Sequence, residues 1–306
     1  EGTKVKEYKE ENDLYTITTE EGTVTARHIL LATHTPKGVL GIHTLIYPYR
    51  EYAVAFNYNG NYVPGIFWGV DGQNKHSIRH YQVESENYII VLGEKHKTGQ
   101  EEHNLRNLES LKEFTRQRFT VGAQAYQWGA QHYRSSDGLP TVGKAHKNSE
   151  VYIATGFSTD GLTYGTMSAQ IITDLITGKD NAYAEIYSPN RHHPIQSAPS
   201  FIKENVNVLV QYLKDFPGIG DVKEADEIKP GQGRVISEGG EKIAAYRDEN
   251  NKLHLCSAVC THMECIVNWN EAERTWDCPC HGSRFSYEGT VIEGPAISDL
   301  AKKELD

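Results

Sequence analysis

Four cysteine and histidine residues near the carboxyl end of the chain have the types and spacing of a metal site. Cys260 and His262 are two residues apart, and Cys278 and His281 are three residues apart. Thiolate sulfur and imidazole nitrogen are both strong ligands for transition metals. The pattern predicts two short loops that hold one small inorganic centre between them.

The identity of that centre depends on how the ligands are grouped. A thiolate and an imidazole from each loop suit either a tetrahedral zinc ion or a two-iron, two-sulfide cluster in which cysteines bind one iron and histidines the other. Structural zinc sites usually pair like ligands within one short motif, whereas each pair here is mixed. The mixed arrangement favours the cluster, with zinc as the alternative.

The stretches CTHMEC and CPCHGS resemble the Rieske iron-sulfur motif, in the disulfide-containing form of cytochrome bc1 and b6f complexes. The resemblance implies a [2Fe-2S] cluster in which Cys260 and Cys278 bind one iron. It implies that His262 and His281 bind the other iron.

Further family features are implied around the cluster. Cys265 would form a disulfide with Cys280, and residues 294–296 (Gly-Pro-Ala) match the loop that covers the cluster. Ser283 matches a serine that donates a hydrogen bond to a bridging sulfide. Phe285 stands where the family has a tyrosine, so one donor hydroxyl is missing. We expect a reduction potential below that of the respiratory proteins, because hydrogen bonds to sulfur raise it.

The first two thirds of the chain contain no cysteine and read mainly as strands. Segments rich in Tyr and Val between residues 4 and 92 are separated by Gly and Asn, which predicts a large, mostly antiparallel sheet. The apolar run Ile29–Ala32 predicts a strand buried on both faces. Apolar residues three apart predict an amphipathic helix over 103–119. A strand over 151–155 leads to a second helix, which begins near Gly161 and stops at Gly178.

The junction between that strand and that helix could bind an anionic group. Backbone amides and the positive end of the helix dipole face outward there. A flavin ring needs such a group, because its reduction places negative charge near N1 and O2. The glycines could instead only allow close packing of helix on sheet.

A series of short motifs over residues 1–191 is similar to the carboxyl half of the D-amino-acid-oxidase-like FAD-dependent oxidoreductases. It includes Asp137-Gly-Leu-Pro140, the segment 151–163 and a final Ser-Pro-Asn-Arg191. The resemblance implies FAD as a cofactor and a loop shaped by residues 137–143. The residues that it places against the flavin are Gly156, Phe157, Gly161, Leu162 and Thr163.

Two departures from that family stand out. No Gly-x-Gly-x-x-Gly follows a strand, so we expect a fragment that lacks the dinucleotide-binding start and holds FAD poorly. His132 and Thr159 occupy positions where the family often has a substrate-binding arginine. The catalytic residues therefore remain unassigned.

We predict an α+β fold in three parts: a partial oxidoreductase domain over 1–191, a linker over 192–224 and a small all-β Rieske domain over 225–306. The linker contains one amphipathic helix, and we expect its apolar stripe to pack on one of the domains. Cys256 falls on a strand and is expected to be a small buried residue. His254 has no paired cysteine and is not expected to be a ligand.

The net charge of −10 argues against nucleic acid and anionic membranes as partners. No apolar run reaches the roughly 18 residues of a transmembrane helix, and we expect a cytoplasmic protein. The whole architecture resembles bacterial FAD-dependent oxidoreductases with a carboxyl-terminal Rieske domain, the YhfW-like group. This resemblance implies a dehydrogenase.

In such a dehydrogenase, a flavin oxidises a small organic, amine-type substrate. The cluster then passes single electrons to a redox partner protein or a quinone-like acceptor. One alternative is a plain Rieske electron carrier with a non-catalytic scaffold. A Rieske oxygenase is disfavoured, because no histidine follows His281 to build an iron site.

Overall fold

The structure is a computed structural model that describes residues 1–36, 39, 41–61, 63–71, 74–191, 202–211 and 225–304. The sheets are mostly antiparallel and the helices few, so the predicted α+β class is confirmed. The strands are divided among several sheets rather than joined in a single large one. The chain forms two compact units: residues 1–47 with 132–205, and residues 48–131 with 206–306.

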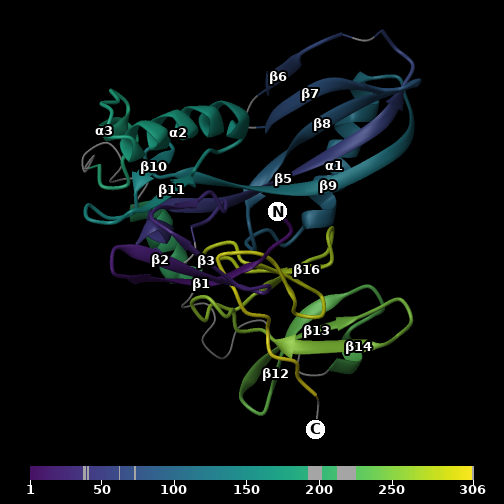
Figure 1. Cartoon of the computed structure of the whole chain (residues 1–306). Helices are drawn as coiled ribbons and strands as arrows, with labels where there is room; N and C mark the ends of the chain where they lie inside the picture. Colours follow the sequence, from purple (N-terminus) through teal and green to yellow (C-terminus); the bar gives the residue numbers. More distant parts are fainter. Residues whose placement is uncertain are drawn as a thin grey trace. The chain divides into compact units, whose positions relative to one another are not determined.

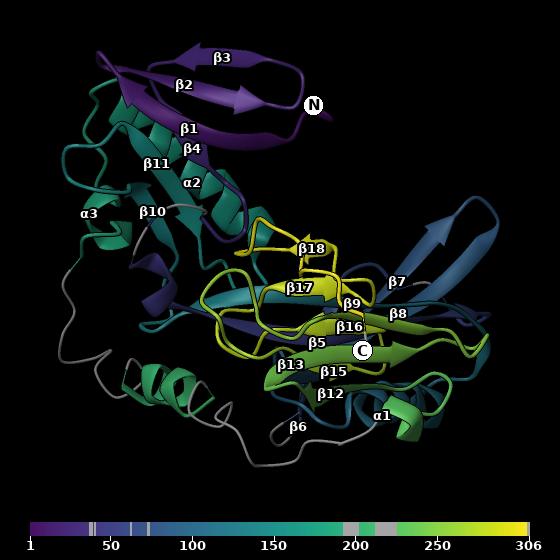
Figure 2. The ribbon, with the colours of Figure 1, turned by 90° about the horizontal axis from the view of Figure 1, so that it is seen from below.

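The first unit contains two three-stranded sheets, of which the antiparallel sheet β1-β2-β3 is visible in Figure 2. In the other, β11 lies between β10 and β4, antiparallel to β10 and parallel to β4. The strands are β1 (Val5–Glu11), β2 (Leu14–Thr19), β3 (Thr23–Ala26), β4 (Ile29–Leu31), β10 (Thr141–Lys144) and β11 (Val151–Thr155). The helices of this unit are η1 (Ile42–Thr44), α2 (Gly161–Ile176) and α3 (Ala184–Tyr187).

Strand β11 is buried on both faces along its whole length. Its alternate residues Val151 and Ile153 join one apolar core, and Tyr152 joins another core with Ile171 of α2. The prediction that the run Ile29–Ala32 is buried on both faces is wrong, because 47% of Leu30 is exposed. Ile29 and Leu31 pack on the core that contains Val151 and Ile153, whereas Leu30 points to the opposite face of the strand and joins none of the described apolar cores.

The second unit begins with a five-stranded antiparallel sheet in the order β6-β7-β8-β5-β9, seen with α1 in Figure 1. Its strands are β5 (Ile46–Tyr58), β6 (Ile66–Asp71), β7 (Asn74–Val83), β8 (Glu86–Lys97) and β9 (Val121–Ser135). Helix α1 (Asn104–Arg118) is close to the predicted range, and its Leu108 and Leu111 pack on the apolar residues of β5 and β8. Strands β5 and β9 cross from one unit to the other.

From residue 225 the second unit forms the small all-β region that the sequence predicts. A three-stranded sheet, β12-β13-β14, and a four-stranded sheet, β15-β16-β17-β18, enclose a core around Trp276 and Phe285. The elements are η2 (Ala225–Glu227), β12 (Gly233–Glu238), β13 (Glu241–Arg247), β14 (Leu253–Ser257), β15 (Asn268–Asn270), β16 (Thr275–Asp277), β17 (Arg284–Ser286) and β18 (Val291–Glu293). Asp248 Oδ1 accepts the amides of Asn250 and Lys252, which fixes the β13–β14 hairpin turn.

Of the linker predicted over 192–224, the structure describes 202–211, which is helical. Phe201 and Leu213 of the predicted apolar stripe lie outside the described residues. Of the other predicted stripe residues, Val206, Leu209 and Val210 are 50%, 54% and 41% exposed, so the expectation that the stripe packs on a domain is not met there. Val208, which is not part of the stripe, packs on the core around Trp276. Within the described ranges, no helix has the length and apolar character needed to cross a bilayer.

Candidate metal centre

Two loops of similar construction carry the predicted ligands. The first follows β14 and is closed by hydrogen bonds from Cys260 N to Cys265 O (2.9 Å) and from Glu264 N to Cys260 O (3.0 Å). The second joins β16 to β17 and is closed from Cys278 N to Ser283 O (2.8 Å) and from Gly282 N to Cys278 O (3.1 Å). The ligands of each pair therefore lie on one tight, hydrogen-bonded turn.

The tertiary structure brings the two predicted pairs together. The thiols of Cys260 and Cys278 are within hydrogen-bonding reach of each other. The imidazole rings of His262 and His281 lie 5.1 Å apart, centre to centre. A pair of neighbouring sulfurs and a pair of neighbouring imidazoles match the donor set of a two-iron cluster with cysteines on one iron and histidines on the other. The residues present therefore fit the group that the sequence predicts.

Backbone amides prepare both sulfurs to be thiolates. The sulfur of Cys260 accepts hydrogen bonds from the amides of His262 and Met263, and that of Cys278 accepts them from the amides of Cys280 and His281. The hydrogen bond from Cys278, followed by these amides, lowers the pKa of Cys260 to about 6. The same thiol pair, together with burial, raises the pKa of Cys278 well above its usual range.

The structure contains a disulfide between Cys265 and Cys280, whose Cα atoms are 6.5 Å apart. It ties the two loops together. The sulfurs of Cys265, Cys278 and Cys280 lie within 4.8 Å of one another. This group does not form a separate metal site, because two of its sulfurs are bonded to each other and only Cys278 can act as a thiolate ligand.

Ser283 and the loop at 294–296 border the site. Ser283 is fully buried; its hydroxyl accepts the amide of Ala296 at 3.0 Å and donates toward the sulfur of Cys260. Thr261 donates to Ser298 O at 2.6 Å, which connects the first ligand loop to the same segment. The prediction that Ser283 and residues 294–296 belong to the cluster environment is consistent with these contacts.

The other cysteine and the extra histidine of this region have ordinary structural roles. Cys256 is fully buried on β14, and burial raises the pKa of its thiol to about 12, as suits an inert packed residue. His254 Nε2 lies 3.0 Å from Asp248 Oδ2. We expected Cys256 to be a small buried residue and His254 not to be a ligand. Both expectations agree with the burial of Cys256 and with the contact of His254 to Asp248.

Sequence reasoning did not identify a buried ion network beside the second ligand loop. Arg50 of β5 is 2% exposed and pairs through two nitrogens with Glu273, next to the β16 strand. Arg284 lies 3.0 Å from Asp277 and 3.3 Å from Glu273. Burial alone would lower the pKa of Arg284, but Asp277 and the two glutamates raise it above its usual value. Glu273, Asp277 and Arg284 lie close together in the sequence, but nothing in the sequence shows that the distant Arg50 pairs with them.

The predicted flavin-contacting residues belong to the first unit. Gly156 directly follows β11 with φ +74°, a backbone conformation that favours glycine, and a Cβ there would lie 2.4 Å from Ser135 Oγ. Residues 161–163 form the exposed first turn of α2, and 93% of Leu162 is exposed. Arg191 makes a two-pronged ion pair with Asp137 at 2.7 and 2.9 Å, which connects the two ends of the motif series.

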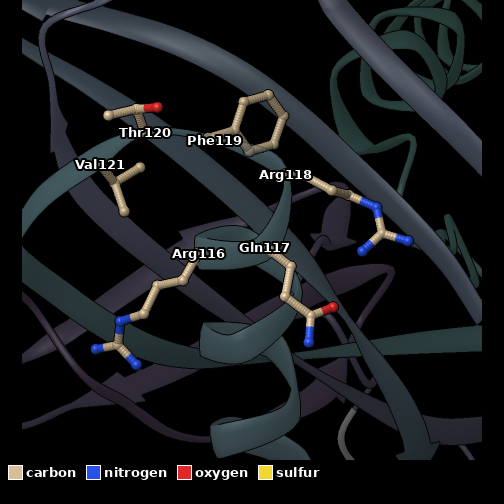
Figure 3. A pocket seen from close by; sticks show the side chains of 6 residues that line it. All are labelled: Arg116, Gln117, Arg118, Phe119, Thr120 and Val121. Carbon is tan, nitrogen blue, oxygen red and sulfur yellow. The ribbon is translucent and has the colours of Figure 1, made fainter.

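One open depression, of about 500 Å³, is lined by residues 116–121 at the end of α1 (Figure 3). Its two cationic side chains already face aromatic rings: Arg118 lies 3.8 Å from the ring of Phe114, and Arg116 lies 5.2 Å from that of Phe56. None of the predicted site residues line it, so it does not alter the assignment of the site.

Comparisons with known proteins agree with both halves of this description. Residues 1–175 match the family of FAD dependent oxidoreductases, and residues 219–304 match the Rieske [2Fe-2S] domain. The chain belongs to the FAD-dependent oxidoreductase family and carries a Rieske domain after it. The cofactors of these two families are FAD and a Rieske [2Fe-2S] cluster.

Among individual relatives, the Rieske-type 2Fe-2S protein YhfW of Bacillus subtilis is 33% identical over 95% of this chain and 57% of its own length. The cytochrome b6-f iron-sulfur subunit of Chlorobaculum thiosulfatiphilum is 35% identical over 28% of this chain and 51% of its own. The chain thus spans about half the length of these relatives. Glycine oxidase of Bacillus cereus has a TM-score of 0.46 and 18% identity over 62% of this chain and 53% of its own.

Proposed function

We propose that the chain is part of an FAD-dependent dehydrogenase that passes single electrons through a Rieske cluster. Cys260 and Cys278 would hold one iron of the cluster, and His262 and His281 the other. The observation that carries the proposal is the convergence of two thiols and two imidazoles from two matching loops. When bound, the cluster supplies one-electron transfer, and FAD supplies two-electron oxidation of the substrate.

The protein's own residues would prepare the thiolate side of this site. Four backbone amides point at the two sulfurs, two to each, and stabilise their negative charge. The hydroxyl of Ser283 adds a fifth donor and is itself oriented by the amide of Ala296. Burial of Cys260 and Cys278 to 1% and 2% exposure excludes water from this side.

The imidazole side is the more accessible one. His262 is only partly buried, and its neighbour Met263 is 56% exposed. The edge of His262 is therefore the position at which a redox partner protein or a quinone-like molecule would accept the electron. An apolar, exposed residue beside it favours a partner with an apolar contact surface.

For the flavin, we assign contacts to Gly156, Phe157, Gly161, Leu162 and Thr163. The exposed first turn of α2 directs unshared backbone amides outward, and this is where negative charge on a reduced ring would be stabilised. The substrate class that we assign is a small amine-type molecule, from which two electrons are removed at a C–N bond.

The cluster is tested by purifying the chain without oxygen and measuring iron, acid-labile sulfide and the EPR signal of the reduced protein. We expect two irons and two sulfides per chain and a spectrum typical of mixed nitrogen and sulfur ligands. Cys260→Ser should abolish the signal, whereas Cys256→Ala, which removes another buried thiol, should retain it. A colourless protein with stoichiometric zinc would contradict the proposal.

The flavin part needs the full-length protein. We expect FAD to copurify with it, and an amine substrate to reduce the cluster under anaerobic conditions. A full-length protein that contains the cluster, binds no flavin and is reduced only by added reductant would instead be a plain electron carrier.

A further inference from the structure

The second ligand loop is held from outside the Rieske region, by residues that belong to the oxidoreductase match. Gln131 of β9 donates through Nε2 to Gly282 O at 2.9 Å, and Thr98 donates to the other end of the same amide at 2.8 Å. Gln100, between β8 and α1, donates through Nε2 to Pro279 O at 2.9 Å. Both carbonyls lie on the loop that carries Cys278 and His281, one on each side of the Cys280–His281 pair.

The approach of the two backbones at this point is unusually close. A Cβ at Gly99 would lie 2.6 Å from Asp277 O, 2.7 Å from Pro279 N and 2.8 Å from Cys278 C. Asn268 closes the contact by donating to Gly99 O at 2.7 Å. Since Gly99 leaves no space for a side chain, the neighbouring Gln100 is placed directly against the ligand loop.

The orientation of the Gln100 amide is fixed by its neighbours. Its nitrogen lies 2.7 Å from Asn207 Oδ1, which also accepts from Lys97 Nζ at 3.1 Å. An ammonium group can only donate, so Asn207 must present its oxygen, and Gln100 must present its nitrogen to both Asn207 and Pro279. Gln100 is therefore the donor in both hydrogen bonds, including the one to the Pro279 carbonyl.

The peptide that receives this hydrogen bond is also the peptide that contacts a ligand sulfur. The carbonyl of Pro279 and the amide of Cys280 belong to one peptide group, and that amide donates to the sulfur of Cys278. A hydrogen bond at the carbonyl polarises the peptide and strengthens the bond made by its N–H. The strengthening matters more when the sulfur carries more negative charge, as it does after the cluster has gained an electron.

We propose that Gln100 is a positioning residue through which the oxidoreductase part raises the reduction potential of the cluster. It acts through the Pro279–Cys280 peptide on the sulfur of Cys278. The proposal rests on the assignment of Cys278 as a ligand, made above. It makes the potential of the cluster depend on the sheet to which the ligand loop is docked.

The test is the midpoint potential of the Gln100→Leu variant, measured by voltammetry or by a redox titration followed by circular dichroism. Cooperative strengthening of a hydrogen bond is about 10–30%. Applied to a hydrogen bond with a charged acceptor, that fraction corresponds to about a 1.3- to 5-fold change in an equilibrium constant. We therefore expect the equilibrium constant for reduction to fall about twofold, a shift of about 18 mV to lower potential at 59 mV per tenfold. Gln100→Asn, whose amide is one methylene short of Pro279, should give a shift in the same direction.

The matched control is Asn268→Leu. It removes an amide donor from the same interface, but one that bonds Gly99 O rather than a peptide that contacts a ligand sulfur. Its midpoint potential should remain that of the wild type. An equal shift in Asn268→Leu would show a general loosening of the interface, and an unchanged potential in the Gln100 variants would show no effect of Gln100; either result overturns the inference.

The failure of this inference can be told apart from failure of the proposed function. Absence of a cluster from the wild-type protein would contradict the proposed function itself. A wild-type protein with a normal cluster whose potential does not respond to Gln100 would contradict only this inference. If Gln100→Leu lost the cluster, Gln100→Asn would provide the measurement.

Discussion

Replacing Arg50 by methionine removes the central cation that joins β5 to the Rieske region and leaves a shorter, unbranched apolar side chain. Arg50 is 2% exposed and donates from Nε and Nη2 to the two oxygens of the Glu273 carboxylate. Its Nη1 also lies 3.4 Å from Glu293. The contact is tightly enclosed, since a Cβ at Gly129 would lie 2.6 Å from Glu273 and 2.7 Å from Arg50.

Breaking a buried ion pair by removing one partner typically costs about 3–5 kcal/mol, because the other charge is left buried. Here Arg284 still lies 3.3 Å from Glu273 and 3.0 Å from Glu293, which partly compensates for the loss. We therefore expect the lower end of that range, about 3 kcal/mol, for Arg50→Met. The matched control is Arg274→Met. Arg274 pairs with Glu249 at 2.9 Å, but both side chains are more than half exposed, so its loss should cost below about 1 kcal/mol.

The measurement is urea unfolding of the cluster-containing protein, followed by the circular dichroism of the cluster and by tryptophan fluorescence. Adding Glu273→Gln to Arg50→Met completes a double-mutant cycle, in which we expect the two losses to be far from additive. If Arg50→Met and Arg274→Met had the same effect on the free energy of unfolding, the buried network would not hold the Rieske region to the sheet. Additive losses in the cycle would lead to the same conclusion.

Three further predictions concern local features. Cys265→Ser removes a disulfide across a sequence separation of 15 and should lower the free energy of unfolding by about 3 kcal/mol, measured by urea unfolding under oxidising conditions. Burial would raise the pKa of Asp137, but hydrogen bonds from Arg191 outweigh burial and lower it. The ionised carboxylate therefore stabilises the folded state above the unfolded pKa near 4, and this contribution is lost as the pH falls through the lower pKa of the folded state. Asp137→Asn should therefore flatten the acid limb of the stability profile, and a parallel profile would contradict this. Gly99→Ala should be more destabilising than Gly138→Ala by at least about 1 kcal/mol in thermal melts, because both have positive φ but only Gly99 meets backbone atoms; equal losses would contradict the close docking.

Much of the fold could be predicted from the sequence because the elements are short and locally specified. The hairpin turn at Asp248 and the amphipathic pattern of α1 depend on residues only a few positions apart. Burial on the scale of a whole sheet was less predictable. Leu30 belongs to an apolar run but points to a face of β4 that no described core covers, whereas β11, of similar composition, has a core on each face. Which faces of a strand are covered is decided by long-range packing, which the local pattern does not contain.

The sequence by itself determined the chemistry of the candidate metal site, because each pair of ligands lies within one tight turn and the types of the four donors define the kind of centre. Only the tertiary structure decided what surrounds it. Gln100 meets Pro279 across a separation of 179 residues, and Arg50 meets Glu273 across 223. A glutamine or an arginine on a strand has many possible polar partners, and only the packing of the sheet against the ligand loop selects one of them.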